Sequence, residues 1–240
     1  MESEIKQRVD WIKEVLKNAH ANGVVVGNSG GKDCTLVEIL CKKATENVLS
    51  VIMPCESKRN YEIDKRHALL VAEKYNIETI EVDITSTKQD LARKLEQFCP
   101  KQQVPMAYAN MNPRLRMTTL YTIAQNKNYL VAGTGNLSEI TMGYFTKWGD
   151  GGYDFNPIAD MTATEVFAML RYLQAPIEII EKAPSAGLYE GQTDEKEMGV
   201  SYAEIDKFIR TGESEKQDVI LKAFNRNQHK RVMPLQFKKQ

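Results

Sequence analysis

Four short apolar runs, rich in β-branched residues, alternate with segments whose apolar residues recur at helical spacing. Strands are predicted at Val24–Gly27, Val48–Met53, Ile77–Val82 and Tyr129–Gly133. Helices are predicted before and between them, at about Ile5–Leu16, Leu36–Leu40, Tyr61–Tyr75, Ser86–Phe98 and Asn112–Asn126. This alternation predicts an α/β fold with a doubly wound parallel sheet and helices on both faces.

The second half of the chain has a different pattern. A stretch with glycines and aromatic residues, Thr141–Asn156, is too long for a simple connection, and such loops in a compact domain are usually functional. Helices are predicted at about 162–172, 176–182, 201–211 and 214–227, with a second irregular stretch over 183–199. No repeat or linker divides the chain. We therefore expect residues 1–240 to form a single domain with a helical C-terminal part.

The composition of the chain argues against nucleic acid, membranes and zinc as its partners. The 32 basic and 32 acidic residues cancel, so no net field draws the chain toward nucleic acid or an anionic membrane. The N-terminus lacks an apolar signal core, and no window is apolar enough to span a bilayer. The three histidines are scattered, which argues against a zinc site. We expect a cytoplasmic protein without a nucleic-acid or membrane partner.

A glycine-containing loop, Ser29-Gly30-Gly31-Lys32-Asp33, follows the first predicted strand and precedes a helix. Glycines there let backbone N–H groups approach an anion, and the helix N-terminus adds partial positive charge. Lys32 supplies a full charge, whereas Asp33 cannot bind phosphate directly and so suggests a bridging Mg²⁺. The spacing fits neither the Walker loop nor the dinucleotide fingerprint. A plain glycine turn with a polar cap is the alternative interpretation.

A second acid, Glu139, follows the fourth predicted strand. The carboxyl ends of parallel strands meet at one edge of the sheet, so Glu139 and Asp33 are expected on the same edge. Two carboxylates that face a phosphate loop make a Mg²⁺ site. Thr134, at the same strand end, can donate to a phosphate or ribose oxygen. The alternatives are a helix N-terminal acid placed for the helix dipole and a turn residue.

The glycine loop resembles the Ser-Gly-Gly-x-Asp-Ser loop of the N-type ATP pyrophosphatases, which have an adenine nucleotide alpha hydrolase-like fold. That resemblance implies cleavage of ATP between its α and β phosphates. Other strings resemble the signatures of one member family, the ammonia-dependent NAD synthetases: Asn112–Met117, Gly133–Glu139, Gly143–Gly152, Pro184–Tyr189 and Gln192–Tyr202. Together they cover most of the chain in the family's order.

The resemblance implies a ligase that takes part in NAD biosynthesis. ATP adenylates the carboxylate of deamido-NAD, and ammonia then gives NAD with release of AMP and pyrophosphate. It also implies a homodimer, and one synthetase domain without a glutaminase domain. Two alternatives stay open: a tRNA thiolation enzyme of the same superfamily that uses Cys34 and Cys55, and a nucleotide-binding paralogue without turnover.

The resemblance also implies roles for individual residues. Asp33 and Glu139 are expected to hold Mg²⁺, and Asp150 is the candidate base for ammonium. The expected ATP contacts are Gly27, Asn28, Ser29, Gly30, Gly31, Lys32, Asp33, Cys34, Met53, Thr134 and Ser185. The expected deamido-NAD contacts are Arg114, Lys147, Asp150, Asp154, His229 and Lys230. For the charged residues of the long loop and the C-terminus, a solvated surface is the alternative.

Two positions depart from the family pattern. Cys34 stands where the final serine of the loop is usual, and a thiol is a poorer donor than a hydroxyl. Thr35 is a candidate to supply the missing hydroxyl. Ala163 stands where many relatives carry a lysine that touches ATP phosphate. Either Lys32 supplies that charge from the loop or the activity is reduced.

Overall fold

The computed structural model describes residues 1–58, 60–101, 103–181 and 194–238. Its strands form one sheet of order β3-β2-β1-β4, and every pair is parallel. The strands are β1 (Gly23–Gly27), β2 (Val48–Ile52), β3 (Glu78–Glu81) and β4 (Tyr129–Ala132). The predicted parallel sheet is therefore confirmed, with each strand within a residue or two of its expected bounds.

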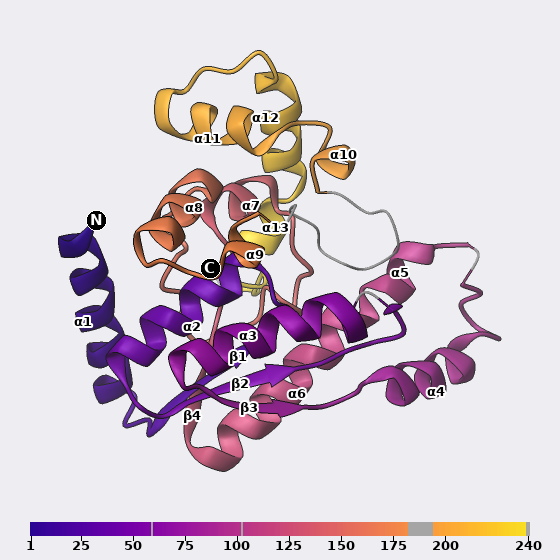
Figure 1. Ribbon diagram of the computed structural model, residues 1–240. Helices are drawn as coiled ribbons and strands as arrows, with labels where there is room; N and C mark the ends of the chain where they lie inside the picture. The colour runs from indigo at the N-terminus through magenta and orange to yellow at the C-terminus, as the bar shows by residue number, and fades with distance from the viewer. Residues whose placement is uncertain (59, 102, 182–193, 239–240) are drawn as a thin grey trace.

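Helices connect and cover these strands (Figure 1). In the first half they are α1 (Glu2–Asn18), α2 (Lys32–Ala44), η1 (Asn60–Asp64, a π-helix), α3 (Lys65–Tyr75), α4 (Thr85–Leu95), α5 (Pro105–Ala109) and α6 (Met111–Lys127). In the second half they are α7 (Leu137–Met142), α8 (Ala163–Tyr172), α9 (Ile177–Ile180), α10 (Asp194–Met198), α11 (Tyr202–Thr211), α12 (Gln217–Arg226) and α13 (Gln228–Arg231).

The two faces of the sheet bury different side chains. Val24 and Val26 point to the face that packs on α1, α2 and α8, whereas Val25 points to the face covered by α6. Successive side chains of a strand point to opposite faces, so the continuous apolar run of β1 serves both layers. The register pairs Val25 with Leu49 of β2 and with Val131 of β4, which gives one apolar row beneath α6.

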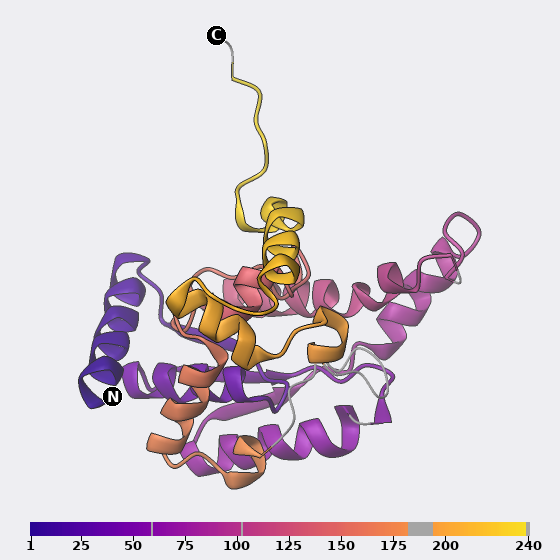
Figure 2. The same cartoon turned by 90° about the horizontal axis from the view of Figure 1, so that it is seen from above.

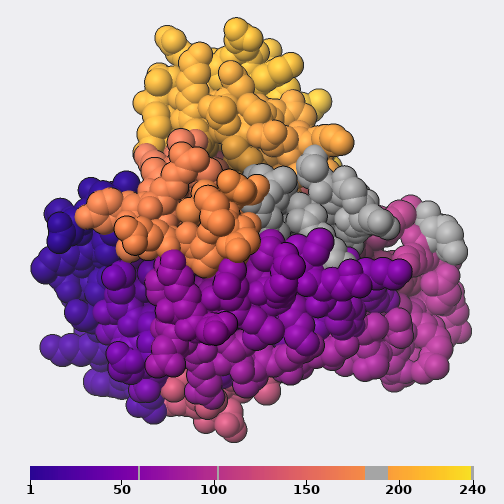
Figure 3. Space-filling view, viewed as in Figure 1, coloured from indigo at the N-terminus to yellow at the C-terminus, as the bar shows by residue number. Residues whose placement is uncertain are grey.

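The C-terminal helices α11 and α12 form a small lobe that packs on α7 and α8 (Figures 1 and 3). Its core joins Met142 at the end of α7 to Tyr202, Ile205 and Ile220 of α11 and α12. Residues 232–238 then leave the body as an extended segment (Figure 2). We find no described helix that combines the length and apolar character needed to cross a membrane.

Some elements differ from the sequence-based prediction. The helix expected from Tyr61 begins as the π-helix η1 and becomes α-helical only at Lys65. The short helices α5 and α13 were not predicted, and α10 falls in a stretch expected to be irregular. Each of these helices has only four or five residues, too few for a hydrophobic period to stand out.

Candidate active site

A cavity of about 820 Å³ opens at the carboxyl ends of β1, β2 and β4. It lies where the strand order reverses, between β1 and β4, which is the usual ligand site of an open parallel sheet. The expected site residues that line it are Gly27, Asn28, Ser29, Gly31, Lys32, Asp33, Cys34, Met53, Arg114, Thr134, Glu139, Lys147, Asp150, His229 and Lys230. Gly30 and Asp154 are described but do not line it, and Ser185 lies outside the described residues.

The glycine loop is held by contacts within itself and with η1. Gly30 has φ +62°, and a Cβ there would come 2.3 Å from the Asp64 carbonyl oxygen, so only glycine fits. Gly30 N donates to Asn28 Oδ1 at 2.8 Å, and Gly31 N donates to Cys34 Sγ at 3.3 Å. These two amides are therefore used inside the loop, and their contact with phosphate stays a prediction.

The cysteine at the family's serine position has a definite place. Cys34 Sγ lies 3.4 Å from Ser29 Oγ and donates to the Gly31 carbonyl at 3.2 Å. Burial, with the nearby Glu38, raises the pKa of this thiol, so it is neutral at pH 7. Thr35 does not supply the missing hydroxyl, because its Oγ1 turns back and donates to the Gly31 carbonyl at 2.7 Å. The thiol itself occupies the serine's place.

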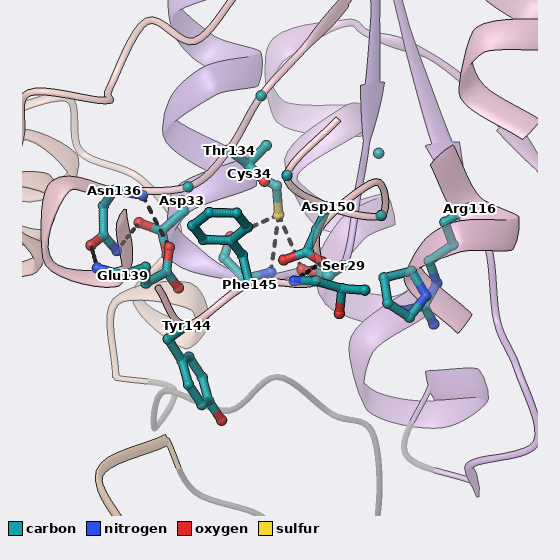
Figure 4. Close-up of a pocket in the computed structure, with 18 of the residues that line it drawn as sticks. Ser29, Asp33, Cys34, Arg116, Thr134, Asn136, Glu139, Tyr144, Phe145 and Asp150 are labelled. Carbon is teal, nitrogen blue, oxygen red and sulfur yellow. Dashed lines mark hydrogen bonds between the residues drawn. The ribbon is translucent and has the colours of Figure 1, made fainter. Parts of the chain in front are cut away.

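The two predicted metal ligands lie at the same end of the cavity, and Asn136 joins them (Figure 4). Asn136 Nδ2 donates to Asp33 Oδ1 at 3.0 Å, and its backbone N donates to Glu139 Oε2 at 3.0 Å. Its Oδ1 accepts from Glu139 N at 3.0 Å, which caps α7. We did not predict a role for Asn136, although Asn-x-x-Glu at a helix start is a capping signal visible in the sequence.

The environment of these two acids disfavours their charge. Desolvation raises the pKa of Asp33 to about 6, against the hydrogen bond from Asn136 that lowers it. Desolvation also raises the pKa of Glu139 well above its ordinary value, and the charge of Asp33 raises it further. A bound cation reverses this situation because it favours both charged forms.

A third acid, Asp194 of α10, adds negative charge to the same end. It accepts from Tyr144 Oη at 3.2 Å and from Tyr202 Oη at 3.1 Å. Its charge raises the pKa of Asp33 and of Glu139. In the sequence, Asp194 belongs only to the Gln192–Tyr202 string, and no local pattern shows that α10 returns to the sheet edge.

Two arginines of α6 reach the other end of the cavity. Arg114 is exposed, and its Nη2 donates to the Lys147 carbonyl at 3.4 Å. Arg116 lies deeper: its Nε donates to the Met53 carbonyl at 3.1 Å, and burial lowers its pKa against the opposing effects of Cys55 and Asp150. Both residues line the cavity, and a substrate contact by either arginine stays a prediction.

Asp150 stands between the acidic end and Arg116 (Figure 4). Its Oδ1 accepts from Thr146 N at 2.9 Å, which fixes the carboxylate on the loop after α7. The side chain is accessible through the open cavity, yet surrounding protein atoms desolvate it and raise its pKa, while Lys230 and Arg116 lower it. A carboxylate with a raised pKa is a stronger base at neutral pH.

The C-terminal His229-Lys230 pair is part of the cavity wall rather than a loose tail. Lys230 Nζ donates to the carbonyls of Gly143 and Phe145 at 2.7 and 2.8 Å. Lys147 Nζ donates to the His229 carbonyl at 2.8 Å. The short helix α13 therefore fastens the loop that carries Asp150.

Asp154 differs from its expected place. Its Oδ2 accepts from Val131 N at 2.7 Å, and its Oδ1 accepts from Tyr121 Oη at 3.1 Å. Asp154 N and Gly133 N donate to the Val131 and Phe155 carbonyls. The loop lines the cavity as far as Tyr153 and then returns to the sheet, so the Asp154 carboxylate bonds to the free edge of β4 instead of facing the cavity.

Comparisons with known proteins agree with this geometry. The family model described as NAD synthase matches residues 4–240. The chain belongs to the NAD synthase family. An NH(3)-dependent NAD(+) synthetase of Carboxydothermus hydrogenoformans is 47% identical over 97% of this chain and 96% of that protein.

Two solved structures are also similar. An NMN synthetase from Francisella tularensis has a TM-score of 0.93 and 35% identity, over 99% of this chain and 98% of that one. An NH3-dependent NAD synthetase from Campylobacter jejuni has a TM-score of 0.79 and 30% identity, over 99% and 98%. Family membership confirms the resemblance that the sequence motifs indicated and the α/β fold.

Membership of the NAD synthase family does not favour the thiolation alternative. The environments of Cys34 and Cys55 do not favour it either. Cys55 is buried, does not line the cavity, and donates to Asn112 Oδ1 at 3.5 Å. Burial raises the pKa of Cys55 as it does for Cys34, whereas a reactive cysteine needs an accessible thiolate. The two thiols do not form a reactive pair.

The acidic end has the ligand chemistry for a magnesium ion. Asp33 and Glu139 offer carboxylate oxygen, and Mg²⁺ commonly takes one or two carboxylates together with substrate phosphates and water. Within the described ranges, no group of three or more His, Cys, Asp or Glu side chains could hold a metal by itself. The site fits an ion that arrives with a phosphate ligand.

Proposed function

We propose that this chain uses ATP and ammonia to convert the nicotinate carboxylate of deamido-NAD into the amide of NAD. It is a ligase that forms a carbon–nitrogen bond, and AMP and pyrophosphate are its other products. The observation that carries the proposal is the meeting of Asp33 and Glu139 at the phosphate loop, inside one cavity that also holds Asp150 and Arg116. Family membership supports the same reaction.

The reaction has two displacement steps. A carboxylate oxygen of deamido-NAD attacks the α-phosphorus of ATP, and the bond to the bridging oxygen breaks, so that pyrophosphate leaves. Ammonia then attacks the carbonyl carbon of the acyl-adenylate, and AMP leaves with the bonding electron pair. Both steps depend on positioning and charge neutralisation, and neither needs a covalent enzyme intermediate.

Each charged group of the cavity has a task in this scheme. Asp33 and Glu139 would hold Mg²⁺, which would neutralise charge on the phosphates. Arg116 and Arg114 meet anionic groups of the substrates, which a guanidinium fork binds well. Asp150 takes a proton from ammonium, a task supported by its raised pKa.

Lys32 supplies the charge that the residue at position 163 lacks. Its ammonium group lies 5.2 Å from the centre of the Phe167 ring, on the helix that begins at Ala163. Lys32 and Ala163 both line the cavity. A lysine charge on this side of the cavity supports an active enzyme rather than a paralogue without turnover.

The wider context follows from the same assignment. We propose that the working protein is a cytoplasmic homodimer of single-domain subunits, which takes free ammonia rather than glutamine. An apparent molecular mass near twice the 27.3 kDa of one chain in gel filtration tests the dimer.

A second substrate is favoured by one observation. The NMN synthetase from Francisella tularensis has the higher TM-score of the two structures described above, 0.93 against 0.79. The mononucleotide with a nicotinate carboxylate offers the same reacting group in a smaller molecule. Comparing kcat/KM for this mononucleotide and for deamido-NAD decides which one the cavity prefers.

One assay tests the proposed function. The full chain is incubated with ATP, Mg²⁺ and deamido-NAD, with ammonium or glutamine as the nitrogen donor, and AMP and NAD are quantified. We expect equal amounts of AMP and NAD with ammonium and little NAD with glutamine. ATP binding without AMP release would support the inactive paralogue, and copurified RNA with sulfur transfer would support thiolation.

A further inference from the structure

A buried polar cluster lies beneath the phosphate loop, and the chemistry above does not use it. It joins Asn28 after β1, Glu38 of α2 and Ser50 of β2, with exposed fractions of 5%, 0% and 0%. Glu38 lies about one helical turn after Cys34, on the side of α2 that faces the sheet. A carboxyl group that is fully buried in an otherwise apolar helix face needs a physical explanation.

The amide nitrogen and oxygen of Asn28 are both occupied, by three hydrogen bonds within the protein. Its Nδ2 donates to Glu38 Oε2 at 2.8 Å and to Ser50 Oγ at 3.1 Å. Its Oδ1 accepts from Gly30 N at 2.8 Å, and Cys34 Sγ lies 3.5 Å from the same oxygen. Although Asn28 lines the cavity, its polar atoms therefore hold the loop rather than point to a ligand.

Glu38 and Gly30 together hold this amide in one orientation. An amide turned by 180° would place its oxygen against the Glu38 carboxyl oxygen and its NH₂ group against the Gly30 N–H. The contact with Gly30 would then set two donors against each other, and the Asn28–Glu38 bond would need the carboxyl group to donate instead of accept. An acceptor at position 38 thus keeps Asn28 Oδ1 directed at Gly30.

The contact with Gly30 sets the shape of the loop. Gly30 has φ +62° and lies against the Asp64 carbonyl of η1, so its N–H is directed inward. Asn28 Oδ1 is the acceptor for that N–H. The adjoining Gly31, Lys32 and Asp33 line the cavity, so their position depends on this inward bond.

The cluster costs stability, which argues against a purely structural role for Glu38. Burial raises the pKa of Glu38 to about 8, against the hydrogen bonds from Ser50 and Asn28. Glu38 Oε1 has no hydrogen-bond partner in the described part of the chain. A methionine would fill similar space without a buried, unpartnered polar atom.

We propose that Glu38 is a positioning residue that orients the Asn28 amide and thereby fixes the phosphate loop for ATP. This inference rests on the proposed use of ATP. It concerns ATP affinity and not the amidation step, because Glu38 is shielded from the cavity by the loop.

The test measures ATP affinity of the full chain by titration with ATP and Mg²⁺, without deamido-NAD. Glu38→Met removes the acceptor, and we expect ATP affinity to fall roughly tenfold, because a buried amide loses its partner. Glu38→Gln keeps an acceptor oxygen of the same shape and should stay within about threefold of the wild type. In steady-state assays, Glu38→Met should raise KM for ATP more than it lowers kcat.

Two further variants separate positioning from stability. Asn28→Leu combined with Glu38→Met removes both polar partners, so the thermal midpoint should recover relative to Glu38→Met alone. ATP affinity should stay low, because the Gly30 N–H then lacks its acceptor. Ile39→Val, at the next buried position of α2, is the matched control, with a lower midpoint and unchanged ATP affinity.

Three results would overturn the inference. The first is that Glu38→Met binds ATP as tightly as the wild type. The second is that the double variant regains ATP affinity. The third is that Ile39→Val loses as much ATP affinity as Glu38→Met when the two variants have comparable thermal midpoints. Failure of the wild-type chain to bind ATP is a different outcome, because it removes the proposed function as well.

Discussion

The two ends of the cavity carry opposite charge. At one end Asp33, Glu139 and Asp194 come together, and each raises the pKa of a neighbour. At the other end Arg116 and Lys230 lie near Asp150, whose charge opposes the lowering of their pKa values. The acids of one end repel each other, whereas the charges of the other end are partly balanced within the protein.

The two ends of the cavity are built by different parts of the fold. Asp33 and Glu139 lie in the first turns of α2 and α7, the helices that follow β1 and β4, so the parallel sheet brings them together. The cationic end is built by α6, the loop after α7 and α13. The sheet therefore fixes the metal and phosphate end, while helices and loops build the end for the organic substrate.

Removing an acid should have the largest effect. Asp33→Ala or Glu139→Ala is expected to lower kcat/KM for NAD formation roughly 10²–10³-fold, the loss typical of a transition-state charge stabiliser. Asp160→Ala is the control, because Asp160 is an exposed acid paired with Arg8 outside the cavity. Full NAD formation in either acid variant removes that residue from the metal role.

The two arginines should differ in importance. Arg116→Met is expected to lower kcat/KM roughly 10–100-fold, because a charged hydrogen bond in a desolvated site contributes about 1.5–3 kcal/mol. Arg114→Met, at the exposed rim, should cost less than about fivefold. A larger loss of kcat/KM in Arg114→Met than in Arg116→Met would make Arg114 the main substrate contact.

Loss of the α13 contact should have an intermediate effect. Lys230→Met removes two hydrogen bonds to the Asp150 loop, so we expect KM for deamido-NAD to rise about three- to tenfold, and KM for ATP to change less. Arg226→Met, on the preceding helix, serves as a charge-matched control. Equal changes in both KM values would show a general loss of folding instead.

The acidic end also predicts a pH dependence of stability. Asp33 has a folded-state pKa of about 6 against 3.8 when unfolded, so the folded state binds its proton more tightly. The favourable contribution is present below pH 3.8 and is lost as pH rises through about 6. Asp33→Asn should therefore raise Tm at pH 7 by several degrees without metal and ATP, because about 1.4 kcal/mol per pKa unit shifts Tm by roughly 2–4 °C per kcal/mol. The gain should vanish near pH 4, as scanning calorimetry can measure.

The smallest effect is expected at the loop cysteine. Cys34→Ser restores the usual hydroxyl in a place where the thiol already makes the loop contacts. We expect KM for ATP to change by no more than about threefold. A change of tenfold or more would mean that the thiol limits phosphate binding.

The sheet and the acidic end could be predicted because their signals are local. Apolar runs such as Val24–Val26 mark buried strands, and the rule that ligands meet strand carboxyl ends puts Asp33 and Glu139 together. The role of Asn136 could also have been predicted, because Asn136 and Glu139 have the spacing of a helix capping box in the sequence.

The remaining features depend on contacts between distant segments. Helix α13 has only four residues, too few to show a periodic pattern of apolar residues in the sequence. Lys230 is positioned by its hydrogen bonds to the carbonyls of Gly143 and Phe145, which are distant in the sequence. The family resemblance implied that Asp154, on the same loop as Asp150, would contact deamido-NAD. Only the fold shows that Asp154 binds Val131 at the strand edge.

The return of the chain to β4 at Asp154 and Phe155 bears on how this protein can diverge. The segment from Gly143 to Tyr153 is anchored at both ends, to the helix before it and to the sheet after it. Doubling the length of a flexible loop costs only about 0.6 kcal/mol of closure free energy. Insertions between these anchors can therefore reshape substrate preference, while the sheet and the phosphate loop remain as they are.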